Sequence, residues 1–280
     1  MSQALQAPQA ATRQEPAAAW PGLRDGLRAE WTKLRTAPGT VWLLLAIIAV
    51  TVALSAAAAG AARCPAVGCG QDPAKVSLTG VDLGQAVVAV LAVLAVSGEY
   101  STGMIRTTLA AMPRRSTVLA AKAAVLTGLV LAAGTVAVLG SLLAGRLILP
   151  GHGFTAAHGF AALSLGTGPV LRACAGSVLY LGLIALLSLG VATAVRDSGV
   201  AIGLVLGLLY LFPIIGAVVS DPRLARHIEQ AAPMTAGLDI QATIGLRGLP
   251  LTPWAGLAVL VAWAVGALLA GALLLRIRDV

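Results

Sequence analysis

Long apolar runs alternate with short polar stretches along most of the chain. A helix of about 20 apolar residues spans a bilayer. Because backbone polar groups in hydrocarbon must pair within their own segment, each run predicts an α-helix. The runs are approximately Val41–Gly60, Leu83–Ser97, Val118–Leu143, Cys174–Val195, Val200–Val219 and Trp254–Leu275. The second is the shortest and needs its flanks, from about Leu78 to Tyr100, to cross. The pattern predicts an all-α, polytopic membrane protein with six transmembrane helices.

Two features inside these runs bear on packing and movement. Pro213 removes a backbone hydrogen bond and is expected to kink the fifth helix, which makes it a candidate hinge. Gly203 and Gly207 form a small-xxx-small pair that permits close helix approach. Plain compositional bias toward Ala and Gly accounts for that pair equally well.

A shorter amphipathic segment, 22–38, precedes the first run. One helical face carries apolar residues, namely Leu23, Leu27, Trp31 and Leu34. The basic residues lie off that stripe, namely Arg24, Arg28, Lys33 and Arg35. This pattern predicts a helix lying in the membrane interface with Trp31 at headgroup depth. The alternative is an ordinary amphipathic helix in the cytoplasm.

The remaining segments divide the chain simply. Residues 1–21 are rich in Ala, Gln and Pro and predict a disordered tail, followed by one transmembrane domain over 22–280. The tight turn 196–198 forces the fourth and fifth helices into an antiparallel hairpin. The long connection 220–253 contains several Gly and Pro residues, so we expect a broken segment.

Charge sets the orientation and excludes several classes of partner. Of the basic residues, 12 fall on the side of the predicted termini and 7 on the other, so both termini are expected in the cytoplasm. Only 11% of residues are charged, whereas about 25% is usual in soluble proteins. The net charge of +8 then indicates contact with anionic lipid headgroups. Nucleic acid is not expected as a partner, since only 4% of residues are aromatic.

The motifs for several kinds of chemistry are missing from the sequence. The phosphate-binding loop of many ATPases has the motif Gly-x-x-x-x-Gly-Lys-Ser/Thr. No lysine of this sequence is preceded by glycine, so the motif is absent and ATP hydrolysis by this chain is excluded. The histidines are scattered, and we expect neither a metal site nor catalytic residues nor a bound cofactor. Asp82 and Glu99 sit at opposite ends of the second run, and no charge lies deep within any run. That pattern disfavours an ion-coupled carrier.

Two of the three cysteines lie close together in one polar loop. Cys64 and Cys69 flank a four-residue stretch between the first two runs. A small disulfide forms if this loop faces an oxidising compartment. Two unpaired thiols are the alternative.

A polar stretch between the second and third runs predicts a short helix against the membrane. Residues 104–112 make about two helical turns, with Met104 and Leu109 on the same rough face. Gly98 and Gly103 allow the chain to bend out of the second run, and Pro113 ends the helix.

These pieces together resemble the permease subunits of bacterial type-2 ATP-binding-cassette exporters. The resemblance rests on Trp31–Arg35, Gly98–Gly103, Ile105–Leu109 and Pro113–Arg115, in that order and spacing, and covers the chain from about Leu23. It implies a bacterial plasma-membrane protein that exports an amphipathic or hydrophobic substrate. It also implies a second permease chain, identical or different, and separate ATPase subunits that bind ATP and Mg.

The resemblance also implies roles for particular segments. Residues 22–38 would be an elbow helix, 98–117 the coupling region that docks on the ATPase, and 220–253 a broken extracellular segment. The implied coupling residues are Glu99, Met104, Arg106, Leu109, Arg114 and Arg115. The implied elbow residues are Leu27, Trp31, Lys33, Leu34 and Arg35.

Other interpretations of these residues and of the whole chain remain. Glu99 is expected to pair with the partner or with Arg106, or else to cap or solvate a helix end. Arg114 and Arg115 are expected either to contact the partner or to anchor to lipid phosphate. For the chain as a whole, the alternatives are a membrane sensor, immunity or regulatory subunit without substrate flux, or an ion-coupled carrier.

Overall fold

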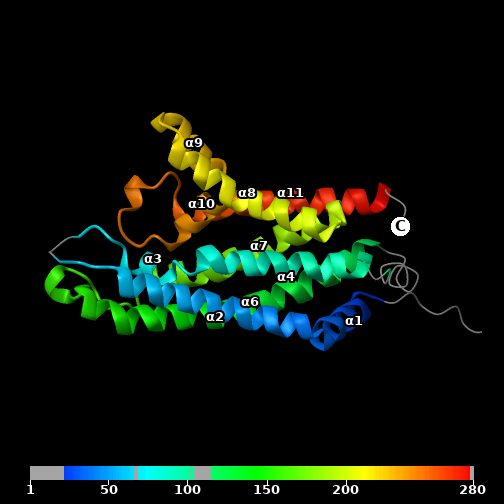
Figure 1. The fold of residues 1–280 in the computed structure, drawn as a ribbon, viewed down its shortest axis with the longest axis horizontal. Coiled ribbons are helices and arrows are strands. Elements are labelled where there is room, and N and C mark those ends of the chain that lie inside the picture. The colour runs from blue at the N-terminus through cyan, green and yellow to red at the C-terminus, as the bar shows by residue number, and fades with distance from the viewer. Residues whose placement is uncertain (1–21, 66–68, 102, 104–114, 278–280) are drawn as a thin grey trace, which may run out of the picture.

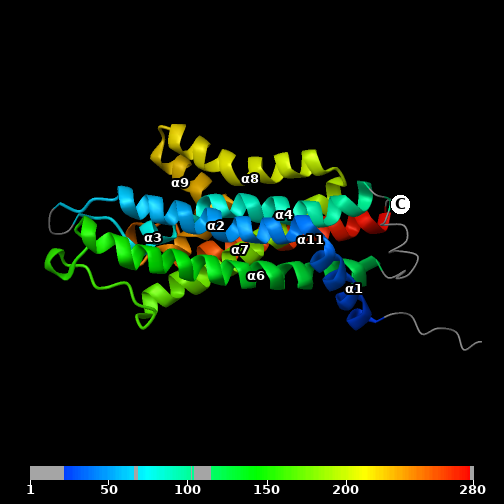
Figure 2. The same cartoon turned by 60° about the horizontal axis from the view of Figure 1, so that its bottom comes forward.

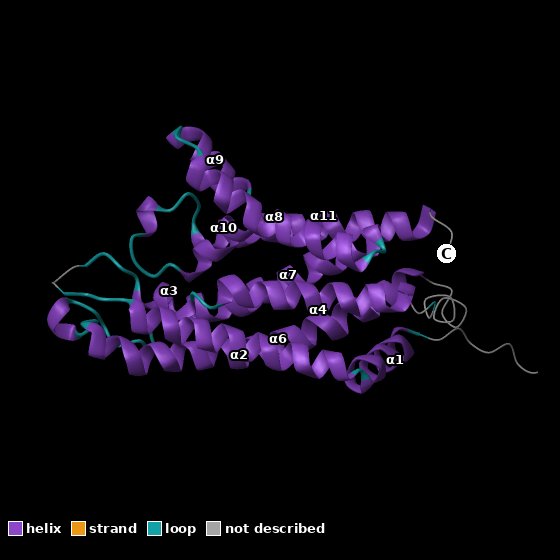
Figure 3. Cartoon of the chain, viewed as in Figure 1, coloured by secondary structure: helices purple, strands orange, loops and turns teal. Residues whose placement is uncertain are grey.

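The computed structural model describes residues 22–65, 69–101, 103 and 115–277 (Figure 1). Within these residues all regular structure is helical, and no strand occurs (Figure 3). The predicted tail, 1–21, lies outside the described residues. The all-α prediction is therefore confirmed for the part of the chain that can be described.

Six helical segments are long and apolar enough to cross a membrane, as predicted. They are α2 (Pro38–Ala61), α3 (Pro73–Leu78) with α4 (Val81–Ser101), α6 (Arg115–Ile148) with η1 (Leu149–His152), α7 (Gly168–Val195), α8 (Ser198–Val218) and α11 (Pro253–Ile277). The third is longer than its predicted end at Leu143. No proline occurs between Leu143 and Pro150, and Arg146 lies in the last turn, where a basic side chain complements the helix dipole.

The long helices run side by side, with α7 in the middle of the bundle (Figures 1 and 2). α7 packs against α4, α6, α8 and α11, and it is the most buried of the candidate spans. The C-terminal part of α11 lies at the same end of the bundle as α1 (Leu23–Thr36), and we call this the terminal end. We call the opposite end the loop end.

Close approach of two helices occurs between α7 and α11, at Gly190 and Gly271. A Cβ added at Gly190 would lie 2.5 Å from the backbone carbon of Ala267. A Cβ added at Gly271 would lie 2.7 Å from the carbonyl oxygen of Gly190. By contrast, nothing lies within 4 Å of a Cβ built at Gly203 or Gly207. The pair chosen from the sequence therefore mediates no close approach within the described chain.

The connection 220–253 is broken into short helices at the loop end. They are α9 (Pro222–Ala231), α10 (Pro233–Leu238), η3 (Asp239–Gln241) and η4 (Leu246–Gly248). Three further short or connecting features share this end, namely α3, η1 and η2 (Ala156–His158). Pro213 lies inside α8, which continues past it to Val218.

Candidate functional site

Four charged side chains from three helices form a closed ring at the terminal end. Glu30 comes from α1, which also supplies Lys33, while Glu99 comes from the last turns of α4 and Lys122 from the second turn of α6. Each lysine contacts both glutamates. We call this set of four residues the ion ring.

The distances in the ion ring are those of charge-assisted hydrogen bonds. Lys122 Nζ donates to Glu30 Oε2 at 2.6 Å and to Glu99 Oε1 at 2.9 Å. Its third donor bond goes to the carbonyl oxygen of Ala95 at 3.2 Å. Lys33 Nζ donates to Glu30 Oε1 at 2.9 Å and to Glu99 Oε1 at 2.8 Å. The charges balance, so the ring stays neutral while all four groups are ionised.

Burial makes these contacts strong and hard to separate. The side chains of Glu30, Lys122 and Glu99 are 0%, 6% and 9% exposed, and that of Lys33 is 29% exposed. A buried charge that loses its partner leaves the other charge uncompensated in a medium of low dielectric constant. The ion ring therefore holds α1, α4 and α6 in one arrangement.

Lys33 is the most exposed member of the ion ring. Burial alone would lower the pKa of its ammonium, but hydrogen bonds to Glu99 and Glu30 and their negative charges outweigh burial. The pKa of Lys33 is consequently raised, and the ammonium stays charged throughout the physiological range.

One carboxylate oxygen of Glu99 accepts no hydrogen bond from the described residues. Its Oε1 accepts from both lysines, whereas Oε2 is buried and has no hydrogen-bond partner among the described residues. A cavity of about 420 Å³ lies beside it, bounded by α1, α2 and α4 and lined mainly by apolar side chains such as Leu43 and Leu94. Glu99 is thus bound inside its own chain and is not a solvated helix cap.

The structure brings together only part of the predicted site. Lys33 and Glu99 meet in the ion ring. Arg115 begins α6, whereas the predicted coupling residues between the helices lie outside the described residues, namely Met104, Arg106, Leu109 and Arg114. The expected pairing of Glu99 with Arg106 therefore stays a prediction.

The elbow residues do not share one environment. Leu34 is buried, Leu27 is half-buried, and Trp31 and Arg35 are exposed. The face of α1 that packs on the bundle is instead Gly26, Glu30 and Leu34. The apolar stripe expected to form one contact surface is therefore split between the bundle and the outside.

Sequence reasoning missed Glu30 and undervalued Lys122. Lys122 lies near the start of α6 and is only 5% exposed, whereas its place in the sequence, just after a polar loop, indicated nothing about its burial. The available signal for Glu30 was its spacing of three residues from Lys33, which places both on one side of a helix.

A second set of polar contacts fastens the loop end. Asp72 caps α3 by accepting from the backbone N–H of Ala74 at 3.0 Å. The same carboxylate accepts from the hydroxyl of Thr243 at 2.7 Å, from the backbone N–H of Thr243 and from the backbone N–H of Ile244 at 3.0 Å. Asp72 therefore joins the α2–α3 connection to the segment between η3 and η4.

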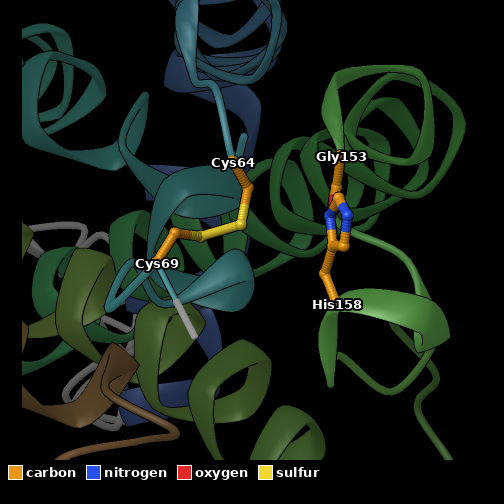
Figure 4. The surroundings of a disulfide bond; sticks show 4 residues. All are labelled: Cys64, Cys69, Gly153 and His158. Atoms are coloured by element: carbon orange, nitrogen blue, oxygen red, sulfur yellow. A yellow bond between two sulfur atoms is a disulfide. The ribbon is translucent and has the colours of Figure 1, made fainter. Parts of the chain in front are cut away.

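The disulfide of Cys64 and Cys69 lies at this end as well (Figure 4). The N–H of Cys64 donates to the carbonyl oxygen of His152 at 2.9 Å. Gly153 has a positive φ of 97°, and a Cβ there would lie 2.1 Å from the Cys64 carbonyl oxygen. His158 Nδ1 donates to the carbonyl oxygen of Gly153 at 2.6 Å, which holds this turn against the cysteine loop. Cys174 is a free, buried thiol.

No group of three or more His, Cys, Asp or Glu side chains in the described ranges is arranged to hold a metal ion. Comparison with models of known protein families found no match, and comparison with curated proteins found none either.

Proposed function

We propose that this chain is the permease subunit of an ATP-binding-cassette exporter. It would move an amphipathic or hydrophobic substrate outward by alternating access, with ATP and Mg bound by a separate ATPase subunit. Two permease chains, identical or different, would form the membrane part. Six apolar helices, with α1 and the end of α11 at one end of the bundle, support the proposal. So does the resemblance carried by 31–35, 98–103, 105–109 and 113–115.

The ion ring is the observation that carries the proposal. Two of its members flank residues 102–114 along the chain, because Glu99 lies just before the end of α4 and Lys122 lies shortly after the start of α6. It also ties α1 to both helices through Glu30 and Lys33. A push on 102–114 would then move α1, α4 and α6 as one unit, since separating the buried charges costs free energy.

The proposed orientation places the terminal end in the cytoplasm of a bacterial cell. The bias of basic residues toward that end favours it. The exposed Trp31 on α1 would lie at the level of the lipid headgroups. Residues 98–117 would then face a cytoplasmic ATPase, and 220–253 the outside.

Reconstitution with a partner tests the proposal. The chain is co-expressed with an ATPase encoded in a neighbouring reading frame, and flux of candidate amphipathic substrates is measured in proteoliposomes. We expect flux only with ATP and the partner, and we expect Arg106→Ala to lower it without lowering the amount of folded protein in the membrane. Arg223→Ala, at an exposed position of α9 at the other end, serves as the control.

Two outcomes would contradict the proposal. Flux without any ATPase would indicate an ion-coupled carrier. Absence of flux with an intact, hydrolysing partner would indicate a sensor or regulatory subunit.

A further inference from the structure

A cavity of about 360 Å³ lies at the loop end, away from the ion ring. Its walls come from α3, α4, α8, α9, α10 and η3. Pockets for small molecules generally measure about 300–1,000 Å³, so this cavity has room for a small ligand.

The lining of this cavity is unbalanced in charge. Asp82, Glu229 and Asp239 contribute carboxylates, and Lys75 contributes the one ammonium among its lining residues. None of the three acids lies within 4.0 Å of a basic nitrogen in the described part of the chain. Lys75 is itself exposed, so water weakens its effect on the acids.

Asp82 lies in the first turn of α4, at the loop end of a candidate membrane span. Its backbone carbonyl oxygen accepts from Tyr210 Oη at 2.6 Å and from Gln85 Nε2 at 3.0 Å. Its carboxylate receives no hydrogen bond from the described residues. An ionisable side chain in such a position is expensive to keep, and it usually marks the path or the site of a ligand.

Asp239 provides an independent observation. It lines the same cavity from η3, yet it is only 7% exposed. Its Oδ2 atom has no hydrogen-bond partner among the described residues. A buried carboxylate without a counter-ion is destabilising unless a cation compensates it.

We propose that this cavity binds a small organic cation whose primary ammonium group contacts the unpaired Oδ2 of Asp239, in a lining to which Asp82 adds a second negative charge. The apolar side chains of Pro213, Met234 and Leu238 line the cavity and would contact the carbon skeleton. Since no metal-binding group of acids, cysteines and histidines occurs in the described ranges, an organic cation fits the lining better than a metal ion. The inference does not depend on the proposed function, because it concerns binding alone.

Equilibrium dialysis of the full chain in a neutral maltoside detergent tests this site. The probe is radiolabelled 1,4-diaminobutane, with 1-butanol as the uncharged competitor. We expect saturable binding that butanol does not displace. Asp82→Asn and Asp239→Asn should each weaken binding about tenfold or more, because each removes a charge with little competing solvent. Asp25→Asn, an exposed acid on α1, is the control and should bind as the wild type does.

Weaker binding by the two Asp→Asn variants could also result from poor folding, so a variant that is expected to bind more tightly is included. Lys75→Gln removes the cation that competes with the ligand, so it should tighten binding about threefold or more. Damage to the fold would not produce tighter binding.

The ammonium can belong to a soluble amine or to a lipid headgroup. Phosphatidylethanolamine is added as a competitor, and its N-acetylated form, which lacks the ammonium, is the control. Displacement by the first lipid alone identifies a headgroup as the occupant, and no displacement by either identifies a soluble amine. The proposal is overturned if the wild type shows no saturable diamine binding, or if Asp82→Asn and Asp239→Asn bind the diamine as tightly as the wild type.

Discussion

Lys122 Nζ lies 2.6 Å from Glu30 Oε2, and this contact joins α6 to α1 across 92 positions of the chain. Neither residue is conspicuous in the sequence, yet both are buried. Together with Lys33 and Glu99 they tie three helices together at the terminal end.

Removal of one charge from the ion ring should destabilise the protein. Lys122→Met leaves Glu30 and Glu99 with Lys33 alone, and the cost of such an uncompensated buried charge is about 3–5 kcal/mol. The double variant Glu30→Gln with Lys122→Met restores neutrality and should recover most of the loss. Unfolding free energies in detergent measure both effects, with the exposed Arg28→Gln as control. A Lys122→Met protein as stable as the wild type would refute the structural role of the ring.

The contact between α7 and α11 should tolerate no added methyl group. Gly190→Ala places Cβ against backbone atoms of Ala267 that cannot rotate away, and such overpacking costs about 1–3 kcal/mol. Gly203→Ala is the matched control, because nothing lies near its Cβ position. Thermal unfolding should separate the two variants. Equal melting temperatures would mean that the two helices do not approach at Gly190.

Asp72 should stabilise the segment between η3 and η4 more than its own helix. Asp72→Ala removes the acceptor for Thr243 and Ile244, and hydrogen bonds to a charged group contribute about 1.5–3 kcal/mol. Faster amide hydrogen exchange is expected at 243–248. Asp221→Ala is the control, because that residue caps α9 only locally. Unchanged exchange at 243–248 would show that this contact is not needed to hold the segment.

The carboxyl of Asp239 should make stability depend on pH. Burial raises its pKa from 3.8 to about 6, opposed by the positive charge of Lys75. Between pH 6 and pH 4 the folded state binds more protons than the unfolded state, so the unfolding free energy rises as pH falls. Asp82, Glu229 and Lys75 line the same cavity, so the wild type must be compared with Asp239→Asn.

The comparison isolates the contribution of Asp239. Relative to Asp239→Asn, the wild type should gain stability on going from pH 7.5 to pH 5. A constant difference between the two proteins over this range would show that Asp239 keeps an ordinary pKa.

Thiol labelling should detect the disulfide at the loop end. Cys64 and Cys69 are bonded to each other, and Cys174 is buried. An impermeant maleimide added to the folded protein is therefore expected to label no cysteine until a reductant is present. Two thiols labelled at once, without reductant, would rule the bond out in the native protein. The variant Cys174→Ala is the control that assigns the signal.

The six long helices could be predicted from the sequence because apolar length is a local property. The apolar run from Val41 to Gly60 predicts α2 by its own length and composition, without reference to any other part of the chain. The ion ring could not be predicted in this way, because it depends on how α1 rotates against α6. The apolar stripe of α1 indicated a different face, and only the packed structure shows that Gly26, Glu30 and Leu34 face the bundle.

The positions where two helices approach closely could not be predicted from the sequence either. Gly203 and Gly207 have the spacing of a contact motif but lie at open positions, whereas Gly190 and Gly271 come from separate helices and share no local pattern. The lining of the loop-end cavity is distributed over several segments, so only the fold shows that Asp82 and Asp239 line the same cavity.

The members of the ion ring lie far apart in the sequence, and this separation has a consequence for biosynthesis. Glu30 leaves the ribosome long before Lys122, so during insertion it has only Lys33 to balance it. Both α4 and α6 must be inserted before Glu99 and Lys122 can reach the glutamate and lysine of α1 and complete the ion ring. Maturation of the protein in the membrane therefore waits for a residue in its third long helix, and nascent chains that stop short of it should be targets for quality-control proteases.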